Sequence, residues 1–220
     1  MADKVELVLV LGDYHIPHRA SAVPEQFQRI LLPNNKITRK CFLYVWTIRL
    51  SASSFTVLIL LHTILLLLYT EVLCTGNLVT KEQADDIKNL APTVHIVRGS
   101  FDEDPSLPES KVVQIGQFKI GLMNGHQIVP WGDPHSLAMV QRQLDVDILI
   151  TGHTHRNEST EYKGKWFINP GSITGAYSTI TADVTPSFIL LSIQGSKVVV
   201  YGYELKNDQV EVTRSEFSKK

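Results

Sequence analysis

The pattern of hydrophobic and polar positions predicts an α/β first half followed by a β-rich second half. Continuous or alternating apolar runs predict strands over residues 5–11, 72–76, 93–97, 111–115, 117–123, 147–150, 166–168, 187–193, 197–203 and 209–212. Apolar residues at helical spacing predict helices over residues 24–32, 80–91 and 133–144. This order favours β-sheets that pack together and are covered by helices.

One apolar segment interrupts this order. Residues 39–71 separate the first predicted helix from the second strand, although such connections usually span about 2–6 residues. Residues 55–69 are almost continuously apolar but fall short of the roughly 20 residues of a membrane span. A single crossing would also place the first two strands on opposite sides of a bilayer. The segment is therefore a membrane anchor, an apolar hairpin on a membrane surface, or sequence foreign to the working protein, such as a retained intron. We expect one domain over residues 1–220, interrupted by this insert.

Composition limits the function classes. A net charge of −1 gives no basic surface for nucleic acid. Cys41 and Cys74 are the only cysteines, too few for a disulfide framework, which favours a reducing compartment. The N-terminus leads directly into the first predicted strand without an apolar signal segment, so we expect a cytosolic protein.

Two pairs of metal-ligand side chains follow predicted strands. Asp13 and His15 follow the first strand, and His153 and His155 follow the strand over 147–150. A spacing of two residues places both side chains of a pair on the same side of an extended chain. Ligands collect at the carboxyl ends of strands in open α/β sheets, so the two pairs together predict a metal site.

Motifs at these strand ends resemble those of the calcineurin-like metallophosphoesterases, and more closely those of the phosphoesterase-fold subunits of retromer. The motifs are Leu-Gly-Asp-Tyr-His-Ile-Pro-His-Arg at 11–19, Cys-Thr-Gly-Asn-Leu at 74–78, His-Ile-Val-Arg-Gly at 95–99, Gly-His-Gln at 125–127 with Pro-Trp-Gly-Asp at 130–133, and Ile-Asn-Pro-Gly-Ser at 168–172. The resemblance covers the chain except the insert. It implies a metallophosphoesterase sandwich of two packed β-sheets flanked by helices.

The resemblance also implies metal ligands. It assigns Asp13, His15 and His155 to a first metal, Asn77 to the bridging position and His153 to a second metal. His95 and His126 are expected to be structural, and the turn at 169–172 is either near the site or only a turn.

Several positions depart from the pattern of the active enzymes. Asn77 is neutral where they have a carboxylate, and Phe101, at the position of the leaving-group acid, has no proton to donate. Asn124 and Ser100 stand at further ligand positions, and Asp102 could compensate only if its loop turned inward. Two divalent ions would face one certain carboxylate, Asp13. We expect at most one weakly held Zn or Mn ion, no catalytic residue and no efficient catalysis.

The resemblance implies a non-catalytic scaffold subunit of retromer in endosome-to-Golgi and endosome-to-plasma-membrane transport, located in the cytoplasm and peripherally on the cytosolic face of endosomes. Its partners would be the helical-solenoid subunit and the rest of retromer, together with regulators such as Rab GTPase-activating proteins. We assign the solenoid contact to Ile128, Val129, Pro130 and Trp131, and a regulator surface to Leu190 and Tyr203. Ordinary core packing is the alternative for both sets. The alternative functions are a weak Mn- or Zn-dependent phosphoesterase and an integral membrane protein.

Overall fold

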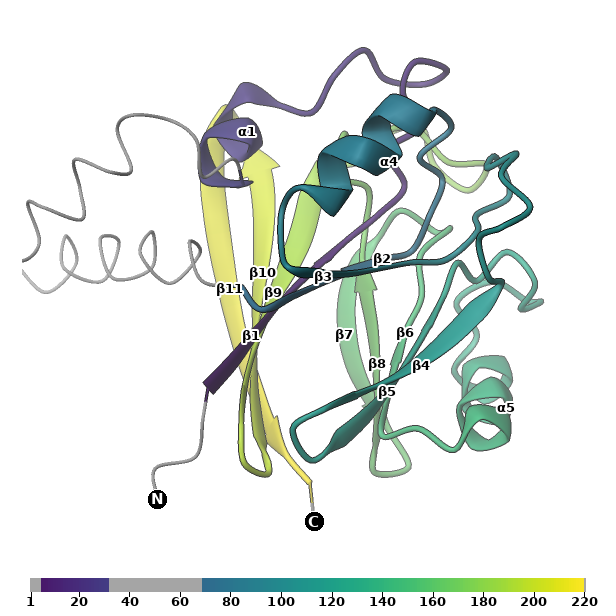
Figure 1. The fold of residues 1–220 in the computed structure, drawn as a ribbon, viewed down its shortest axis with the longest axis vertical. Coiled ribbons are helices and arrows are strands. Elements are labelled where there is room, and N and C mark those ends of the chain that lie inside the picture. Colours follow the sequence, from purple (N-terminus) through teal and green to yellow (C-terminus); the bar gives the residue numbers. More distant parts are fainter. Residues whose placement is uncertain (1–4, 32–68, 220) are drawn as a thin grey trace, which may run out of the picture.

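The computed structural model describes residues 5–31 and 69–219, which form two mixed β-sheets with few helices (Figure 1). The strands are β1 (Val5–Leu11), β2 (Glu71–Cys74), β3 (Thr93–Ile96), β4 (Ser110–Ile115), β5 (Phe118–Met123), β6 (Ile148–Ile150), β7 (Asn157–Tyr162), β8 (Lys165–Pro170), β9 (Ser187–Gln194), β10 (Lys197–Lys206) and β11 (Gln209–Ser218). The helices are α1 (Glu25–Leu31), α4 (Lys81–Lys88) and α5 (Pro134–Leu144).

The two sheets have different strand orders. The six-stranded sheet runs β11-β10-β9-β1-β2-β3; β1, β2 and β3 are parallel and the other neighbours are antiparallel. The five-stranded sheet runs β4-β5-β6-β8-β7, with parallel pairing of β5, β6 and β8. Each sheet therefore contains three parallel strands, at one side of the six-stranded sheet and in the centre of the five-stranded sheet, whose ends can carry a site.

Alternating side chains of β1 define the layers. Leu7, Leu9 and Leu11 belong to the core beneath α1 and α4, whereas Val8 and Val10 face the core between the two sheets. A third cluster joins α5 to the five-stranded sheet. Helices therefore cover the outer faces of two packed sheets, as Figure 1 shows, and the predicted sandwich is confirmed.

Most predicted elements are present with small shifts at their ends. Thr80 caps α4 and Asp133 caps α5, each through a side-chain oxygen that accepts a backbone N–H bond. The sequence prediction missed β7, whose residues are mostly polar and alternate between exposed and half-buried at a sheet edge. It also ended β11 too early, because the exposed residues of that strand carry little apolar pattern.

The predicted insert lies outside the described residues except for residues 69–71, which belong to the folded domain. Tyr69 is buried and its hydroxyl donates to the carbonyl of Leu31 at 2.7 Å, while Glu71 begins β2. The backbone therefore returns at Tyr69 close to where α1 ends. Because β2 pairs directly with β1, the first two strands share one sheet.

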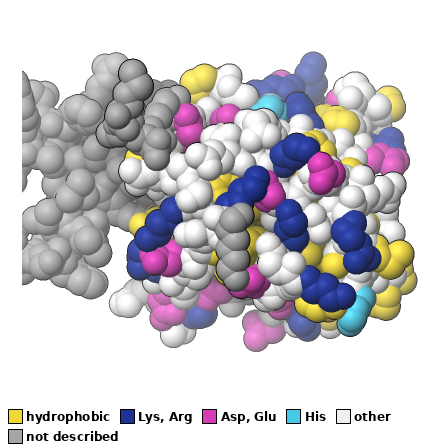
Figure 2. All heavy atoms as spheres, turned by 90° about the horizontal axis from the view of Figure 1, so that it is seen from below, with side chains coloured by type: hydrophobic (Ala, Val, Ile, Leu, Met, Phe, Trp, Pro, Cys, Tyr) yellow, Lys and Arg dark blue, Asp and Glu magenta, His cyan; other side chains and the backbone are white. Residues whose placement is uncertain are grey.

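Within residues 5–31 and 69–219, no helix is long and apolar enough to cross a membrane. On the face seen from below, Lys and Arg side chains lie among Asp and Glu side chains (Figure 2). This face carries no single-sign field of the kind that attracts nucleic acid.

Candidate metal centre

The predicted site residues gather where parallel strands of both sheets end. Each follows a strand by a few residues, so the topology brings together segments more than 100 residues apart in sequence, as the 140-residue separation of His15 and His155 illustrates. The strands concerned and the residues that follow them are β1 with Asp13 and His15, β2 with Asn77, β5 with Asn124, and β6 with His153 and His155.

Three potential ligand atoms converge at this edge. His15 Nε2 lies 3.2 Å from His155 Nε2, and Asp13 Oδ1 lies 3.9 Å and 3.8 Å from these two nitrogens. The point equidistant from all three atoms is about 2.1 Å from each, within the range of about 2.0–2.2 Å for Zn–N and Zn–O bonds. We call Asp13, His15 and His155 the metal triad; all three are buried and could bind one metal ion.

Both histidines of the triad can offer a lone pair. His155 Nδ1 lies 2.6 Å from the carbonyl oxygen of Ala176, so this nitrogen carries the proton and leaves Nε2 as the acceptor. Burial, with contributions from nearby positive groups, lowers the pKa of His15 to about 3. His15 is therefore neutral at pH 7, as metal binding requires.

Asp13 is a buried carboxylate that lacks a strong cationic partner in the described residues. Its Oδ1 accepts from Asn77 Nδ2 at 2.7 Å and its Oδ2 accepts from the backbone N–H of His153 at 2.8 Å. Burial nevertheless raises its pKa, although His155 and these two hydrogen bonds oppose the increase. A divalent cation would supply the missing charge.

Asn77 does not present an oxygen to the triad. Its amide lies between the Asp13 carboxylate, which is an acceptor, and the backbone N–H of Phe101, which donates to Asn77 Oδ1 at 3.0 Å. These partners fix the amide with its nitrogen toward Asp13. Asn77, which the resemblance places at the bridging position, therefore directs its amide nitrogen and not its oxygen toward Asp13.

Two further residues that the resemblance places at ligand positions, Asn124 and His153, are also held by protein contacts. Asn124 Nδ2 donates to the carbonyl of Thr75 at 2.7 Å, and its Oδ1 lies 2.9 Å from His126 Nδ1. The His153 ring packs edge-on against Trp131 at 4.5 Å and is not one of the triad ligands, although its Nε2 has no hydrogen-bond partner in the described structure. His126 and His95 also lie outside the triad.

The Ser100–Asp102 loop adds no ligand. Ser100 is exposed. Asp102 accepts backbone N–H bonds from Asn77, Leu78, Val79 and Gly99 at 2.7–2.9 Å, so its carboxylate holds the loop after β2 and does not turn inward to the triad. The donor set therefore fits one divalent ion, with Asp13 as its only carboxylate.

The site loops have a strained backbone. A non-glycine residue with positive φ is uncommon and costs about 1–3 kcal/mol, so several together require strong local support. Residues of the site with φ between 49° and 71° are Asp13, His15, Asn77, His153 and His155. Gly152 permits a close approach to the triad, because a Cβ there would lie 2.7 Å from Asp13 Oδ2.

The segment after β8 supplies support that the sequence did not identify. The Ser172 hydroxyl donates to the carbonyl of Asp13 at 2.7 Å, and the Thr174 hydroxyl donates to that of Tyr14 at 2.8 Å. Together with the Ala176 carbonyl on His155, these bonds make the predicted turn at 169–172 the start of a structural clamp on the triad. In the sequence, only the position of the turn at 169–172 in the motif series indicated that this segment lies near the site.

The residues predicted to bind partners are divided between surface and core. Val129 is 74% exposed, Trp131 is 42% exposed and Pro130 is also exposed, whereas Ile128 packs in the core against α5. The Trp131 side chain is held in place by a hydrogen bond, because its indole Nε1 donates to the carbonyl of His126 at 3.2 Å.

Leu190 and Tyr203 do not form the expected surface. Leu190 is fully buried, and Tyr203 is buried and stacks on Phe188. Core packing, the alternative interpretation, describes both residues, because they lie on strands covered by α1.

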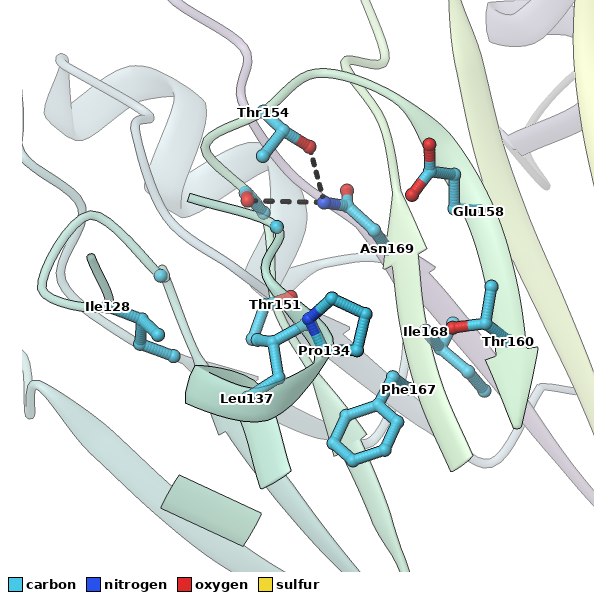
Figure 3. A pocket seen from close by; sticks show the side chains of 13 residues that line it. Ile128, Pro134, Leu137, Thr151, Thr154, Glu158, Thr160, Phe167, Ile168 and Asn169 are labelled. Atoms are coloured by element: carbon cyan, nitrogen blue, oxygen red, sulfur yellow. Dashed lines mark hydrogen bonds between the residues drawn. The ribbon is translucent and has the colours of Figure 1, made fainter. Parts of the chain in front are cut away.

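A small cavity of about 100 Å³ is lined by Ile128 and by residues of the loop after β6, among them Thr151 and Thr154 (Figure 3). Its walls include Ile128, Leu137 and Phe167, and Asn169 donates from its rim to Thr154 Oγ1 at 2.9 Å. The triad does not line this cavity, so the cavity does not extend the metal centre.

Comparisons with known proteins agree with this geometry. The family model described as the calcineurin-like phosphoesterase superfamily domain matches residues 60–196. The vacuolar protein sorting-associated protein 29 of Schizosaccharomyces pombe is 31% identical over 97% of this chain and 98% of its own length. The Vps29 structure of Cryptosporidium parvum has 41% identity and a TM-score of 0.79, with 99% of this chain and 100% of that chain covered.

The zinc complex of wild-type Vps29 from Entamoeba histolytica has 45% identity and a TM-score of 0.76, with 96% of this chain and 99% of that chain covered. Sequence and structure therefore agree over nearly the full length. This chain belongs to the vacuolar protein sorting-associated protein 29 family of the calcineurin-like phosphoesterase superfamily.

Proposed function

We propose that this chain is a non-catalytic scaffold subunit of retromer, which supports endosome-to-Golgi and endosome-to-plasma-membrane transport by binding the helical-solenoid subunit. Membership of the Vps29 family supports the assignment to protein sorting. The observation that carries the proposal is an exposed apolar loop, Val129 to Trp131, which packs through Trp131 on His153 beside the metal triad.

The loop has the properties of a preorganised docking surface. Val129 is largely exposed at the tip, while Trp131 is held between the His126 carbonyl and the His153 ring. A rigid apolar surface loses little conformational entropy on binding, and large apolar or aromatic residues contribute most to interfaces.

The chemistry of the site supports a non-catalytic role. Phe101 takes the position of the proton donor, and Asn77 donates to Asp13 where a bridging carboxylate would be needed. The role that we assign to the triad is to hold one weakly bound Zn or Mn ion. The zinc complex of the E. histolytica relative supports zinc.

Membrane association would follow from the complex, with this subunit peripheral on the cytosolic face of endosomes. Regulators such as Rab GTPase-activating proteins belong to the same proposal. Because Leu190 and Tyr203 are buried, such regulators would have to contact other residues.

Co-expression with the helical-solenoid subunit tests the proposal. We expect co-elution on size exclusion, and we expect Val129→Asp to weaken binding by more than about 30-fold, because it places a charge in an apolar contact. Val212→Asp on β11 is the matched control, since Val212 has 48% exposure on the six-stranded sheet. Equal losses in both variants, or no co-elution of the unchanged chain, would contradict the proposal.

The same assay tests the insert in a chain that lacks residues 39–68. Residues 32–38 would then have to connect Leu31 to Tyr69, whose hydroxyl lies 2.7 Å from the Leu31 carbonyl. We expect the shortened chain to co-elute at least as well as the full chain. Loss of co-elution only on deletion would show that the insert is needed.

A weak metal-dependent phosphoesterase is the alternative, favoured by the intact triad. Turnover of an aryl phosphate with added Mn²⁺ or Zn²⁺ distinguishes the two functions. We expect no turnover above that of the His155→Ala variant.

A further inference from the structure

Four side chains form a continuous stack over one edge of the metal triad. The Phe101 ring meets the His15 ring edge-on at 5.0 Å, and the Arg19 guanidinium carbon lies 4.5 Å from the Phe101 centroid. On the other side of Arg19, the Tyr177 centroid is 5.0 Å away. The order from inside to outside is His15, Phe101, Arg19 and Tyr177.

Backbone contacts fix both ends of this stack. Arg19 Nη1 donates to the carbonyl of Tyr177 at 3.1 Å. The preceding carbonyl, that of Ala176, accepts from the triad ligand His155, and the backbone N–H of Arg19 donates to the carbonyl of the triad ligand His15. Arg19 therefore links the segments that carry the two metal-binding histidines.

Exposure increases from His15 through the Phe101 ring to the Tyr177 ring, while Arg19 between the two rings is half-buried. His15 is buried, Phe101 is 38% exposed and Tyr177 is 52% exposed. Phe101 is tied to the site by its backbone N–H bond to Asn77 Oδ1, but its side chain is held from outside by Arg19. A guanidinium between two aromatic faces is attracted to both rings.

We propose that Arg19 and Tyr177 act as a latch that keeps Phe101 closed over His15 and thereby slows the exchange of the metal ion with solvent. The inference rests on the metal-binding part of the proposed function. It gives Phe101, which cannot serve as a proton donor, a role as a shield for the metal. Arg19 and Tyr177 are positioning residues, since they act on the metal through Phe101.

Stopped-flow release of Zn²⁺ from the full chain to an excess chromophoric chelator tests the latch. Arg19→Ala removes the guanidinium, and Tyr177→Ala removes the outer of its two ring contacts. We therefore expect each variant to release Zn²⁺ about tenfold faster than wild type. Uptake should accelerate by a similar factor, with the equilibrium affinity within about threefold of wild type, because a latch changes the barrier more than the end states. Tyr177→Phe keeps the ring and should behave as wild type.

Arg29→Ala is the control for loss of an arginine, because Arg29 is exposed on α1 and pairs with Glu25. Urea unfolding of each metal-free variant checks that the fold is retained, which we expect because Tyr177 is half exposed. If only the positive charge of Arg19 matters, Arg19→Ala will bind zinc more tightly and Tyr177→Ala will match wild type; this result would overturn the latch.

The failure of metal binding itself is a separate result. If the unchanged chain takes up no zinc, the metal proposal and the latch are both wrong, while solenoid co-elution is still read independently. If the chain binds zinc and Tyr177→Ala releases it at the wild-type rate, the latch alone is wrong.

Discussion

The two halves of the site differ in what their polar atoms contact. On the triad side, Asp13, His15 and His155 direct one ligand atom each toward a common point. On the other side, the amides of Asn77 and Asn124 are occupied by protein hydrogen bonds. One half of the site therefore presents three potential ligand atoms, and the amides of the other half are held by protein contacts.

The difference is clearest at Asn77, whose neutral amide supports Asp13 and presents no oxygen to the triad. Replacing a bridging carboxylate by Asn77 removes a charge but keeps a contact with Asp13, now as a hydrogen bond at 2.7 Å. The neutral amide avoids placing two carboxylates together in a buried site with one cation. The surviving triad and its supporting residues are then compatible with a single metal ion.

Paired histidine variants test this comparison most directly and should give the largest effect. His155→Ala removes a ligand and should weaken zinc binding by about 1,000-fold. His153→Ala, two residues earlier in the same loop, should change it by less than about threefold, because its ring packs on Trp131. Competition titration with a chelator measures both affinities. Similar losses in the two variants would mean that both halves bind metal.

Substitution of Gly152 tests whether the close packing of Gly152 against Asp13 and Thr75 is rigid. In Gly152→Ala the added Cβ would lie 2.7 Å from Asp13 Oδ2 and 2.6 Å from Thr75 Oγ1, so we expect the free energy of unfolding to fall by about 3 kcal/mol. Gly164→Ala meets no atom within 4 Å and has a φ of +74°, so it should cost about 1 kcal/mol from backbone strain alone. Urea unfolding gives both values. Equal losses of unfolding free energy would show that Asp13 and Thr75 can move to accommodate the added Cβ.

Asn77→Asp attempts to restore the lost half. Its new carboxylate would stand where an amide nitrogen now lies 2.7 Å from Asp13 Oδ1, so we expect the metal-free protein to lose about 2 kcal/mol of unfolding free energy. Excess Mn²⁺ should recover this loss and raise the metal content from one to two ions per chain.

Asn169→Asp is the control for Asn77→Asp, because it also removes a buried amide donor, in this case one bonded to Thr154 and Gly152. Excess Mn²⁺ should not recover the unfolding free energy that Asn169→Asp loses. Metal analysis of the dialysed proteins and urea unfolding with and without Mn²⁺ give the result. If the metal content of Asn77→Asp stays at one ion per chain, the missing carboxylate is not the only reason why a second ion does not bind.

The sequence predicted the elements with strong apolar patterns and the strand ends that carry the triad. Residues 5–11 and 147–150 have few polar positions, so their strands and the polar residues after them were evident. The polar edge strand β7 was not, since its position depends on pairing with β8 and not on its own burial.

The roles of individual site residues depended on three-dimensional contacts. The orientation of Asn77 follows from Phe101 N–H on one side and Asp13 on the other, residues 24 and 64 positions away. In the same way, Leu190 is an apolar residue of a strand, and only the packing of α1 over that strand decides that it is buried. Long-range partners of this kind are not contained in local sequence patterns.

Asp147 provides a reference carboxylate outside the site, and its effect should fade at low pH. Burial would raise its pKa, but hydrogen bonds from Lys219, Lys165 and the backbone N–H of Lys119 lower it to about 2. Because the folded pKa lies below the ordinary value, Asp147 stabilises the fold fully above about pH 4 and loses this contribution as the pH falls toward 2. This behaviour is opposite to that of Asp13, whose pKa burial raises.

We therefore expect Asp147→Asn to lower the unfolding free energy by about 2 kcal/mol at pH 7 and by much less at pH 2.5. Asp145→Asn is the control, because the exposed Asp145 pairs only at the surface with Lys119 and should change stability little at either pH. Urea unfolding at the two pH values measures the differences. Asp147→Asn could also lose the same unfolding free energy at both pH values. The lysines would then not stabilise the ionised carboxylate, and pairing with cations would not distinguish Asp147 from Asp13.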